Sequence, residues 1–192
     1  MSVQVRPATP DRWSDLVTVF GRRGKDPSWC WCRLFLRPAT CEASEPTDNR
    51  DALRREITHA ALPPGLLAYV GDHPVGWTRV GPRSDFPRVS GNRDLAKVLT
   101  GDPGVWWVTC FAVDSRHRRS GVGSALLKAA VEFAREHGAT AVEGHPVDVA
   151  ALSAARVGGS GIFTGTVAMF SAAGFTEVAR TYPTRPVMRL LL

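Results

Sequence analysis

The strongest constraint on the fold is a loop that joins an apolar segment to an amphipathic one. Residues 105–113, Val-Trp-Trp-Val-Thr-Cys-Phe-Ala-Val, are rich in β-branched and aromatic side chains and predict a buried strand. From Val122 to Phe133 apolar residues recur at helical spacing, and Gly138 supplies a helix stop. The loop between them carries three arginines and two glycines. A strand, loop and helix in this order direct backbone N–H groups and a positive helix dipole at one point, which predicts a site for a phosphate or pyrophosphate.

Two common phosphate loops do not fit this segment. A P-loop needs Gly, four residues and then Gly-Lys-Ser/Thr, and a dinucleotide fingerprint needs a third glycine where Leu126 stands. What remains is the pattern Arg/Gln, two residues, Gly, one residue, Gly/Ala, in the order Arg118-Arg119-Ser120-Gly121-Val122-Gly123. Between a strand and a helix, this pattern resembles the coenzyme A loop of the GCN5-related N-acetyltransferases. The alternative is a surface loop with solvated arginines.

The rest of the chain supports the resemblance. We expect strands at 3–6, 66–70, 75–80, 105–113, 139–145, 175–180 and 186–191, and helices at 11–21, 47–61, 122–137 and 166–173, with Thr47 as an N-cap. This order is similar to the acyl-CoA N-acyltransferase fold, an α/β fold with a central mixed sheet of six to seven strands flanked by helices. Phe170 to Phe175 resembles the family's late motif, in which an aromatic residue precedes Gly-Phe. We therefore expect one domain over residues 1–192.

The resemblance implies where coenzyme A lies. In the family, two adjacent parallel strands splay apart, and the free edge of the first strand hydrogen-bonds the pantetheine arm. Here that edge is the backbone of Phe111, Ala112 and Val113. The pyrophosphate then meets the N–H groups of Arg118, Arg119, Gly121, Val122, Gly123 and Ser124. Glycine is needed because a Cβ at 121 or 123 would hold the backbone away from the phosphate oxygens.

The chain departs from the family at its catalytic positions. The family commonly has a tyrosine acid in the late helix, where this chain has Phe170, and a carboxylate base on the strand that here carries Trp107 and Thr109. The nearest titratable residues are Glu143 and His145, expected on one face of the second splayed strand. Either could remove a proton from an amine. Alternatively, Glu143 is a buried carboxylate paired with an arginine and His145 an edge residue.

Cysteines and tryptophans in the first third of the chain suggest two further roles. Trp29 and Trp31 lie in an irregular segment that the resemblance places near the acceptor, so they either wall that pocket or pack over the core. The spacing of Cys30, Cys32 and Cys41 fits no common structural zinc site, so we expect no metal. Cys110 is expected to alternate with Trp106 and Val108 on one strand, as a core thiol rather than an acyl-carrying nucleophile.

Composition limits the class of protein. No export signal and no run of eighteen apolar residues is visible, so we expect a cytoplasmic protein with reduced thiols and no membrane partner. The net charge of +6 is carried almost wholly by arginine, whose one dense cluster lies on the proposed phosphate loop. That charge suits coenzyme A and is only weak support for nucleic acid. The sequence leaves open whether the chain forms a homodimer.

The sequence thus predicts an enzyme, an acetyl-CoA-dependent N-acetyltransferase acting on a primary amine of a small molecule or peptide. The alternative from another class is a non-catalytic acyl-CoA binding or sensing module of the same fold, which the missing tyrosine and carboxylate favour. A nucleic-acid binding protein is the weakest candidate, because it rests on charge alone.

Overall fold

A seven-stranded mixed sheet forms the centre of the protein. The computed structural model describes residues 2–21, 30–37, 46–154 and 162–192. The strands lie in the order β1-β2-β3-β4-β5-β7-β6, and only β4 and β5 are parallel neighbours. They are β1 (Val3–Pro7), β2 (Gly65–Val70), β3 (His73–Pro82), β4 (Val105–Val113), β5 (Ala141–Gly144), β6 (Thr176–Tyr182) and β7 (Arg185–Leu191). The expected mixed sheet flanked by helices is confirmed, with seven strands.

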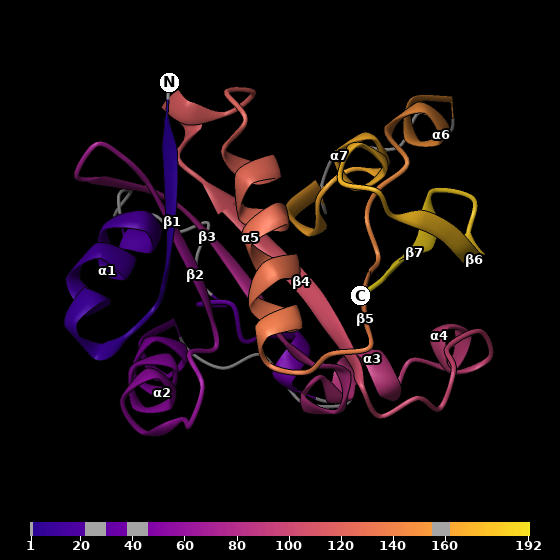
Figure 1. The fold of residues 1–192 in the computed structure, drawn as a ribbon, viewed down its shortest axis with the longest axis horizontal. Coiled ribbons are helices and arrows are strands. Elements are labelled where there is room, and N and C mark those ends of the chain that lie inside the picture. Colours follow the sequence, from indigo (N-terminus) through magenta and orange to yellow (C-terminus); the bar gives the residue numbers. More distant parts are fainter. Residues whose placement is uncertain (1, 22–29, 38–45, 155–161) are drawn as a thin grey trace.

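Helices cover both faces of this sheet (Figure 1). They are α1 (Trp13–Gly21), α2 (Pro46–His59), α3 (Pro87–Ser90), α4 (Arg93–Ala96), α5 (Val122–Glu136), α6 (Val149–Ala154) and α7 (Val167–Ala172). Single 3-10 turns lie at Pro10–Arg12 (η1), Leu34–Leu36 (η2), Arg83–Asp85 (η3), Ser115–His117 (η4) and Ile162–Thr164 (η5). None of the helices in the described part of the chain is long and apolar enough to cross a membrane.

Two cores lie on opposite faces of the sheet. Because strand side chains alternate between faces, β2 sends Leu66 and Ala68 to the core under α5 and sends Leu67 and Tyr69 to the core under α1 and α2. A third cluster packs α3, α4 and η2 against Trp107 of β4. Buried apolar area of this kind supplies most of the stability of a domain.

A β-bulge in β4 decides the geometry of the middle of the sheet. The β3–β4 register passes from Val80↔Val108 to Thr78↔Phe111, so β4 has one more residue than β3 in this interval. A bulge of this kind bends the strand and increases its twist. The parallel ladder to β5 ends with Val108↔Gly144, directly before the bulge. The two parallel strands therefore separate where β4 gains its extra residue.

The bulge corrects one expectation about side-chain direction. Trp106 and Val108 pack in the core under α5, whereas Cys110 packs in the core under α1 and α2. The expectation that Cys110 shares a face of the strand with these two residues is wrong. The extra residue at the bulge turns the side chains that follow it to the opposite face of the sheet. Cys110 is nevertheless buried, with 9% of its surface exposed.

Several element boundaries differ from the expectation. Helix α2 begins at Pro46, so Thr47 is a helical residue and not the N-cap. Strand β5 ends at Gly144, one residue before His145. The segment between β3 and β4, to which the sequence assigned neither strand nor helix, contains η3 and two short helices, α3 and α4. Between β5 and α7, the described residues form α6 and η5.

Candidate functional site

The separation of β4 from β5 leaves one edge of β4 without a ladder partner. Among the described residues, positions 111–113 pair with β3 on one side, and no backbone hydrogen bond joins them to β5 or η5 on the other. Unpaired N–H and C=O groups on a strand edge are ready to bind another extended chain. The predicted cofactor residues Phe111, Ala112 and Val113 all lie on this edge and are half-buried.

The loop that follows β4 is braced by its own polar groups. The Asp114 carboxylate accepts a hydrogen bond from the Arg116 N–H (3.1 Å) and forms an ion pair with its guanidinium (3.0 Å). Ser120 Oγ donates to the His117 carbonyl oxygen at 2.6 Å. Arg116 is thus engaged locally, whereas the exposed Arg118 and Arg119 extend from the next turn of the loop.

The loop ends at a helix N-terminus suited to an anion. Arg119 (φ 59°) and Gly121 (φ 88°) both adopt left-handed backbone, which turns the chain into α5. The first helical hydrogen bond runs from the Ala125 N–H to the Gly121 carbonyl, so the N–H groups of residues 122–124 have no acceptor within the helix. The first turn contains no acidic residue and has no side-chain cap. These donors and the positive helix dipole together favour a phosphate.

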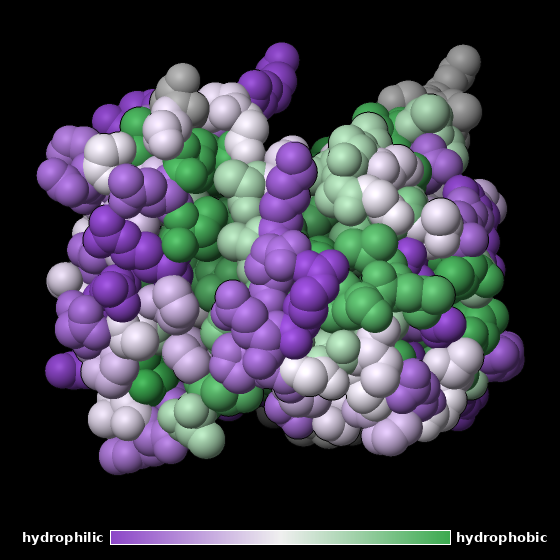
Figure 2. Space-filling view, in the orientation of Figure 1, coloured by the Kyte–Doolittle hydropathy of each residue, from purple (hydrophilic) through white to green (hydrophobic). Residues whose placement is uncertain are grey.

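The strand edge and the helix N-terminus open on the same side of the molecule. Figure 2 shows the surface hollowed between the 114–121 loop and the lobe that carries α6 and α7. Gly123 packs against α7, because a Cβ added there would stand 3.1 Å from the sulfur of Met169. The structure thus brings the predicted coenzyme A residues of β4, the loop and α5 together.

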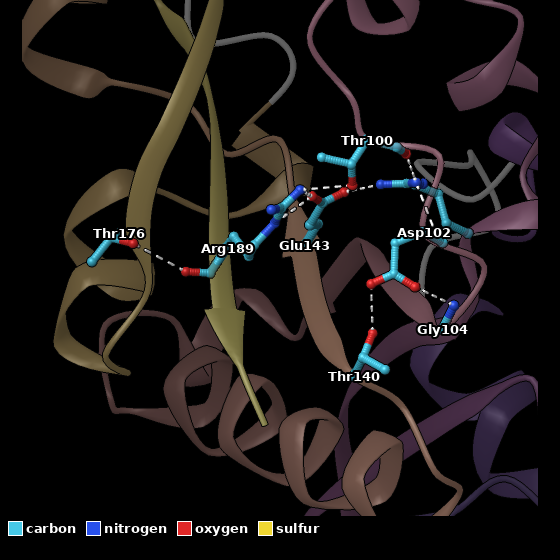
Figure 3. A network of polar contacts seen from close by, with 8 residues as sticks. Thr100, Asp102, Gly104, Thr140, Glu143, Thr176 and Arg189 are labelled. Carbon is cyan, nitrogen blue, oxygen red and sulfur yellow. Dashed lines mark hydrogen bonds and ion pairs between the residues drawn. The ribbon is translucent and has the colours of Figure 1, made fainter.

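Glu143 lies in a buried ion-pair network (Figure 3). Its carboxylate accepts from Arg83 Nη1 at 2.6 Å and from Arg189 Nε at 2.8 Å, and its side chain has no exposed surface. Both guanidinium groups also hydrogen-bond Thr100, so the network ties β5 and β7 to the segment before β4. Glu143 could act as a base only after releasing an arginine. Its catalytic role stays a prediction, and the geometry gives it a structural one.

His145 stands just past the end of β5. Its Nε2 lies 2.9 Å from Thr181 Oγ1 and 3.2 Å from the Arg185 carbonyl oxygen, which orients the ring against the β6–β7 hairpin. Burial lowers the pKa of His145 to about 4, so the imidazole is neutral at neutral pH. A neutral ring can accept a proton. The two predicted residues thus differ in their surroundings: Glu143 is held between two arginines, whereas His145 contacts the β6–β7 hairpin.

The positions where the family commonly has its acid and base hold core residues. Phe170 is fully buried and packs edge-on against Phe175 (4.9 Å between ring centroids) and Phe111 (6.3 Å). Trp107 and Thr109 are both 1% exposed. The hydroxyl of Thr109 has no hydrogen-bond partner within the described residues. No tyrosine or carboxylate replaces the family's groups at these positions.

The first tryptophan–cysteine segment is only partly described. Trp29 and Cys41 lie outside the described residues. Trp31 is buried against Trp13 (6.2 Å between ring centroids) and Phe20 (5.3 Å), so it packs over the core. A role for Trp31 in an acceptor pocket stays a prediction. Over the residues the structure describes, no group of three His, Cys, Asp or Glu side chains is placed to hold a metal ion.

A splayed parallel strand pair, followed by an arginine loop and an uncapped helix, defines the acyl-CoA N-acyltransferase class of fold. Residues 29–158 match the model of the acetyltransferase (GNAT) family, and this is more than half of the chain. The chain belongs to the GNAT acetyltransferase family. Its sequence matches none of the curated proteins.

Solved structures share the fold at low sequence identity. The GNAT domain of S. lividans PAT is 20% identical, with a TM-score of 0.58 over 100% of this chain and 92% of that one. The ribosomal-protein-alanine N-acetyltransferase of Brucella melitensis is 16% identical, with a TM-score of 0.54 over 98% and 99%. The yncA protein of Salmonella typhimurium, solved with acetyl-CoA, is 12% identical, with a TM-score of 0.55 over 100% and 95%.

Proposed function

We propose that this protein transfers the acetyl group of acetyl-CoA to a primary amine of a small molecule or peptide by direct attack. The observation that carries the proposal is the unpaired edge of β4 leading into an uncapped helix N-terminus. The backbone at 111–113 would bind the pantetheine arm. Arg118, Arg119 and the N–H groups of 121–124 would bind the pyrophosphate. The related fold of yncA was solved with acetyl-CoA, which supports this cosubstrate.

For the proton of the attacking amine, we favour His145 over Glu143. Attack on the thioester requires a neutral amine, so a nearby group must take up its proton. His145 is neutral and half-buried, whereas Glu143 is enclosed by two arginines. A pKa of about 4 makes His145 a weak base, which suits a relay through water better than direct capture of the proton. The thiolate of coenzyme A leaves without a protein acid at position 170, because Phe170 has no proton to donate.

The same geometry also suits a non-catalytic acyl-CoA sensor. The specific observation in favour of a sensor is the loss of both family catalytic positions to Phe170 and to the pair Trp107 and Thr109. Either function is proposed for the cytoplasm, in agreement with Cys30, Cys32 and Cys110 being outside any disulfide.

Two measurements test the proposal. Calorimetric titration with acetyl-CoA should give saturable heat, and its absence would remove both the enzyme and the sensor. Release of free coenzyme A thiol is then followed across a panel of amines that includes amino acids, polyamines and a peptide N-terminus. Turnover with at least one amine establishes the transferase. Tight binding of acetyl-CoA with no turnover across the panel establishes the sensor.

A further inference from the structure

Two buried thiols meet on the face of the sheet opposite α5. Cys32 comes from the segment between α1 and α2, and Cys110 comes from the bulge of β4. Both side chains belong to the same buried cluster, where each thiol affects the ionisation of the other, and only 3% of Cys32 and 9% of Cys110 is exposed. The proposed acetyl transfer uses neither thiol.

A buried arginine lies beside this pair. The Arg79 guanidinium, 3% exposed, binds the Glu56 carboxylate through two hydrogen bonds of 2.7 and 3.0 Å. Its positive charge also acts on Cys32, and its Nε proton has no oxygen or nitrogen acceptor among the described residues. Glu56 also pairs with Arg33 at 3.2 Å, so one carboxylate faces two guanidinium groups, and a thiolate at Cys32 would supply a second negative charge.

The two thiols have opposite tendencies to ionise. Burial alone would raise the pKa of Cys32, but the hydrogen bond from Cys110 and the charge of Arg79 outweigh it and lower that pKa below its usual range. The hydrogen bond to Cys32, with burial, raises the pKa of Cys110. Of the two thiols, Cys32 therefore ionises first while Cys110 keeps its proton, which is the order expected of a nucleophilic and a resolving cysteine.

Cys32 lies in a strained stretch of backbone. Trp31 (φ 41°) and Cys32 (φ 57°) both adopt left-handed backbone, which is uncommon for residues other than glycine. Strain of this kind gathers at functional sites. Here it lets Trp31 pack against α1 while Cys32 contacts β4.

We propose that Cys32 and Cys110 form a peroxide-reactive dithiol site. The Cys32 thiolate attacks one oxygen of hydrogen peroxide, the O–O bond breaks, and hydroxide leaves, giving a sulfenic acid. The Cys110 sulfur, losing its proton, then attacks the Cys32 sulfur; the S–O bond breaks and water leaves. One peroxide is reduced to two waters, counting the protonated hydroxide, and two thiols are oxidised to one disulfide.

The site goes beyond the proposed acetyl transfer but shares a strand with it. Cys110 stands in the bulge that separates β4 from β5, directly before the edge at 111–113. A disulfide there would join the cofactor strand to the segment between α1 and α2. A small oxidant such as hydrogen peroxide suits a site in which both sulfurs are nearly enclosed.

The test treats the reduced protein with one equivalent of hydrogen peroxide, alkylates the remaining thiols and maps the digest by mass spectrometry without reduction. We expect a Cys32–Cys110 cross-linked peptide that dithiothreitol reverses. The rate should fall about tenfold per pH unit below the pKa of the nucleophilic thiol, since only the thiolate reacts. Cys110→Ala should leave a sulfenic acid at Cys32 that dimedone traps, and Cys32→Ala should abolish both products.

Cys30→Ala is the matched control, because Cys30 is half-buried two residues away and should leave the cross-link unchanged. Circular dichroism and thermal unfolding establish that each variant folds. The proposal is overturned if native wild-type protein keeps both thiols while urea-unfolded protein oxidises, or if the disulfide contains Cys30 or Cys41. None of these readouts needs acetyl-CoA or an amine, so their failure is distinct from failure of the proposed function.

Discussion

Val108 and Gly144 form the last pair of the parallel ladder between β4 and β5. Gly144 is confined at this point, because a Cβ added to it would stand 2.5 Å from the ring of Phe170 and 3.2 Å from Val108 Cγ1. The buried phenylalanine thus packs directly against the place where the two strands separate. An aromatic core residue occupies the space from which the family's tyrosine would act.

Gly144→Ala should destabilise the protein by about 1–3 kcal/mol, because the added methyl group overpacks a closed contact with Phe170. Urea unfolding measures the change. Gly101→Ala is the control, since a Cβ at Gly101 meets nothing within 4 Å. Equal stability of the two variants would show that the ring of Phe170 can move away from β5.

Gly121→Val should weaken acetyl-CoA binding by at least about tenfold, because a branched side chain stands where the phosphate approaches the backbone. Gly71→Val is the matched control: both glycines have positive φ and open space around an added Cβ, but Gly71 lies in the β2–β3 turn. Each variant should lose about 1–2 kcal/mol of stability to backbone strain. Equal acetyl-CoA affinities by calorimetry would remove the loop as the pyrophosphate site.

Arg118→Ala and Arg119→Ala should each weaken acetyl-CoA binding about three- to tenfold and reduce its dependence on salt. The reason is that exposed guanidinium groups attract the cofactor phosphates through a screened charge interaction. Arg93→Ala, an exposed arginine of α4, should leave both the affinity and its salt dependence unchanged. Calorimetry at two ionic strengths checks this, and an equal effect of all three variants would indicate general charge attraction only.

Glu143→Gln distinguishes a base from a structural carboxylate. Loss of the charge leaves the half-buried guanidinium groups of Arg83 and Arg189 without their counter-ion, which should cost about 3 kcal/mol of stability. If Glu143 also takes the amine proton, acetylation slows more than acetyl-CoA binding weakens. Urea unfolding, calorimetry and thiol release separate these effects, and unchanged turnover would remove Glu143 as the base.

How much the sequence could predict depends on the range of the interaction. The strand, loop and helix from 105 to 136 follow from local periodicity and glycine placement, so their positions, and their likeness to a coenzyme A loop, could be read directly. The face of Cys110 could not, because a bulge depends on the pairing with β3. The second arginine of Glu143 lies on β7, 46 residues away, and only the folded sheet brings it there.

Protonation of His145 should make stability depend on pH between about 4 and 6.5. Its pKa is about 4 in the folded protein and 6.5 in its unperturbed state, so in this interval the unfolded chain binds more protons. Stability is therefore full above pH 6.5 and falls as the pH drops towards 4, by at most about 3 kcal/mol. His145→Gln should remove this pH dependence of the free energy of unfolding, measured with urea, whereas His73→Gln, exposed at the β2–β3 turn, should not.

His145→Gln should also lower turnover about 100-fold with little change in acetyl-CoA affinity if the ring relays the amine proton. A flattened pH profile with normal turnover would make His145 a structural residue and leave the proton to water.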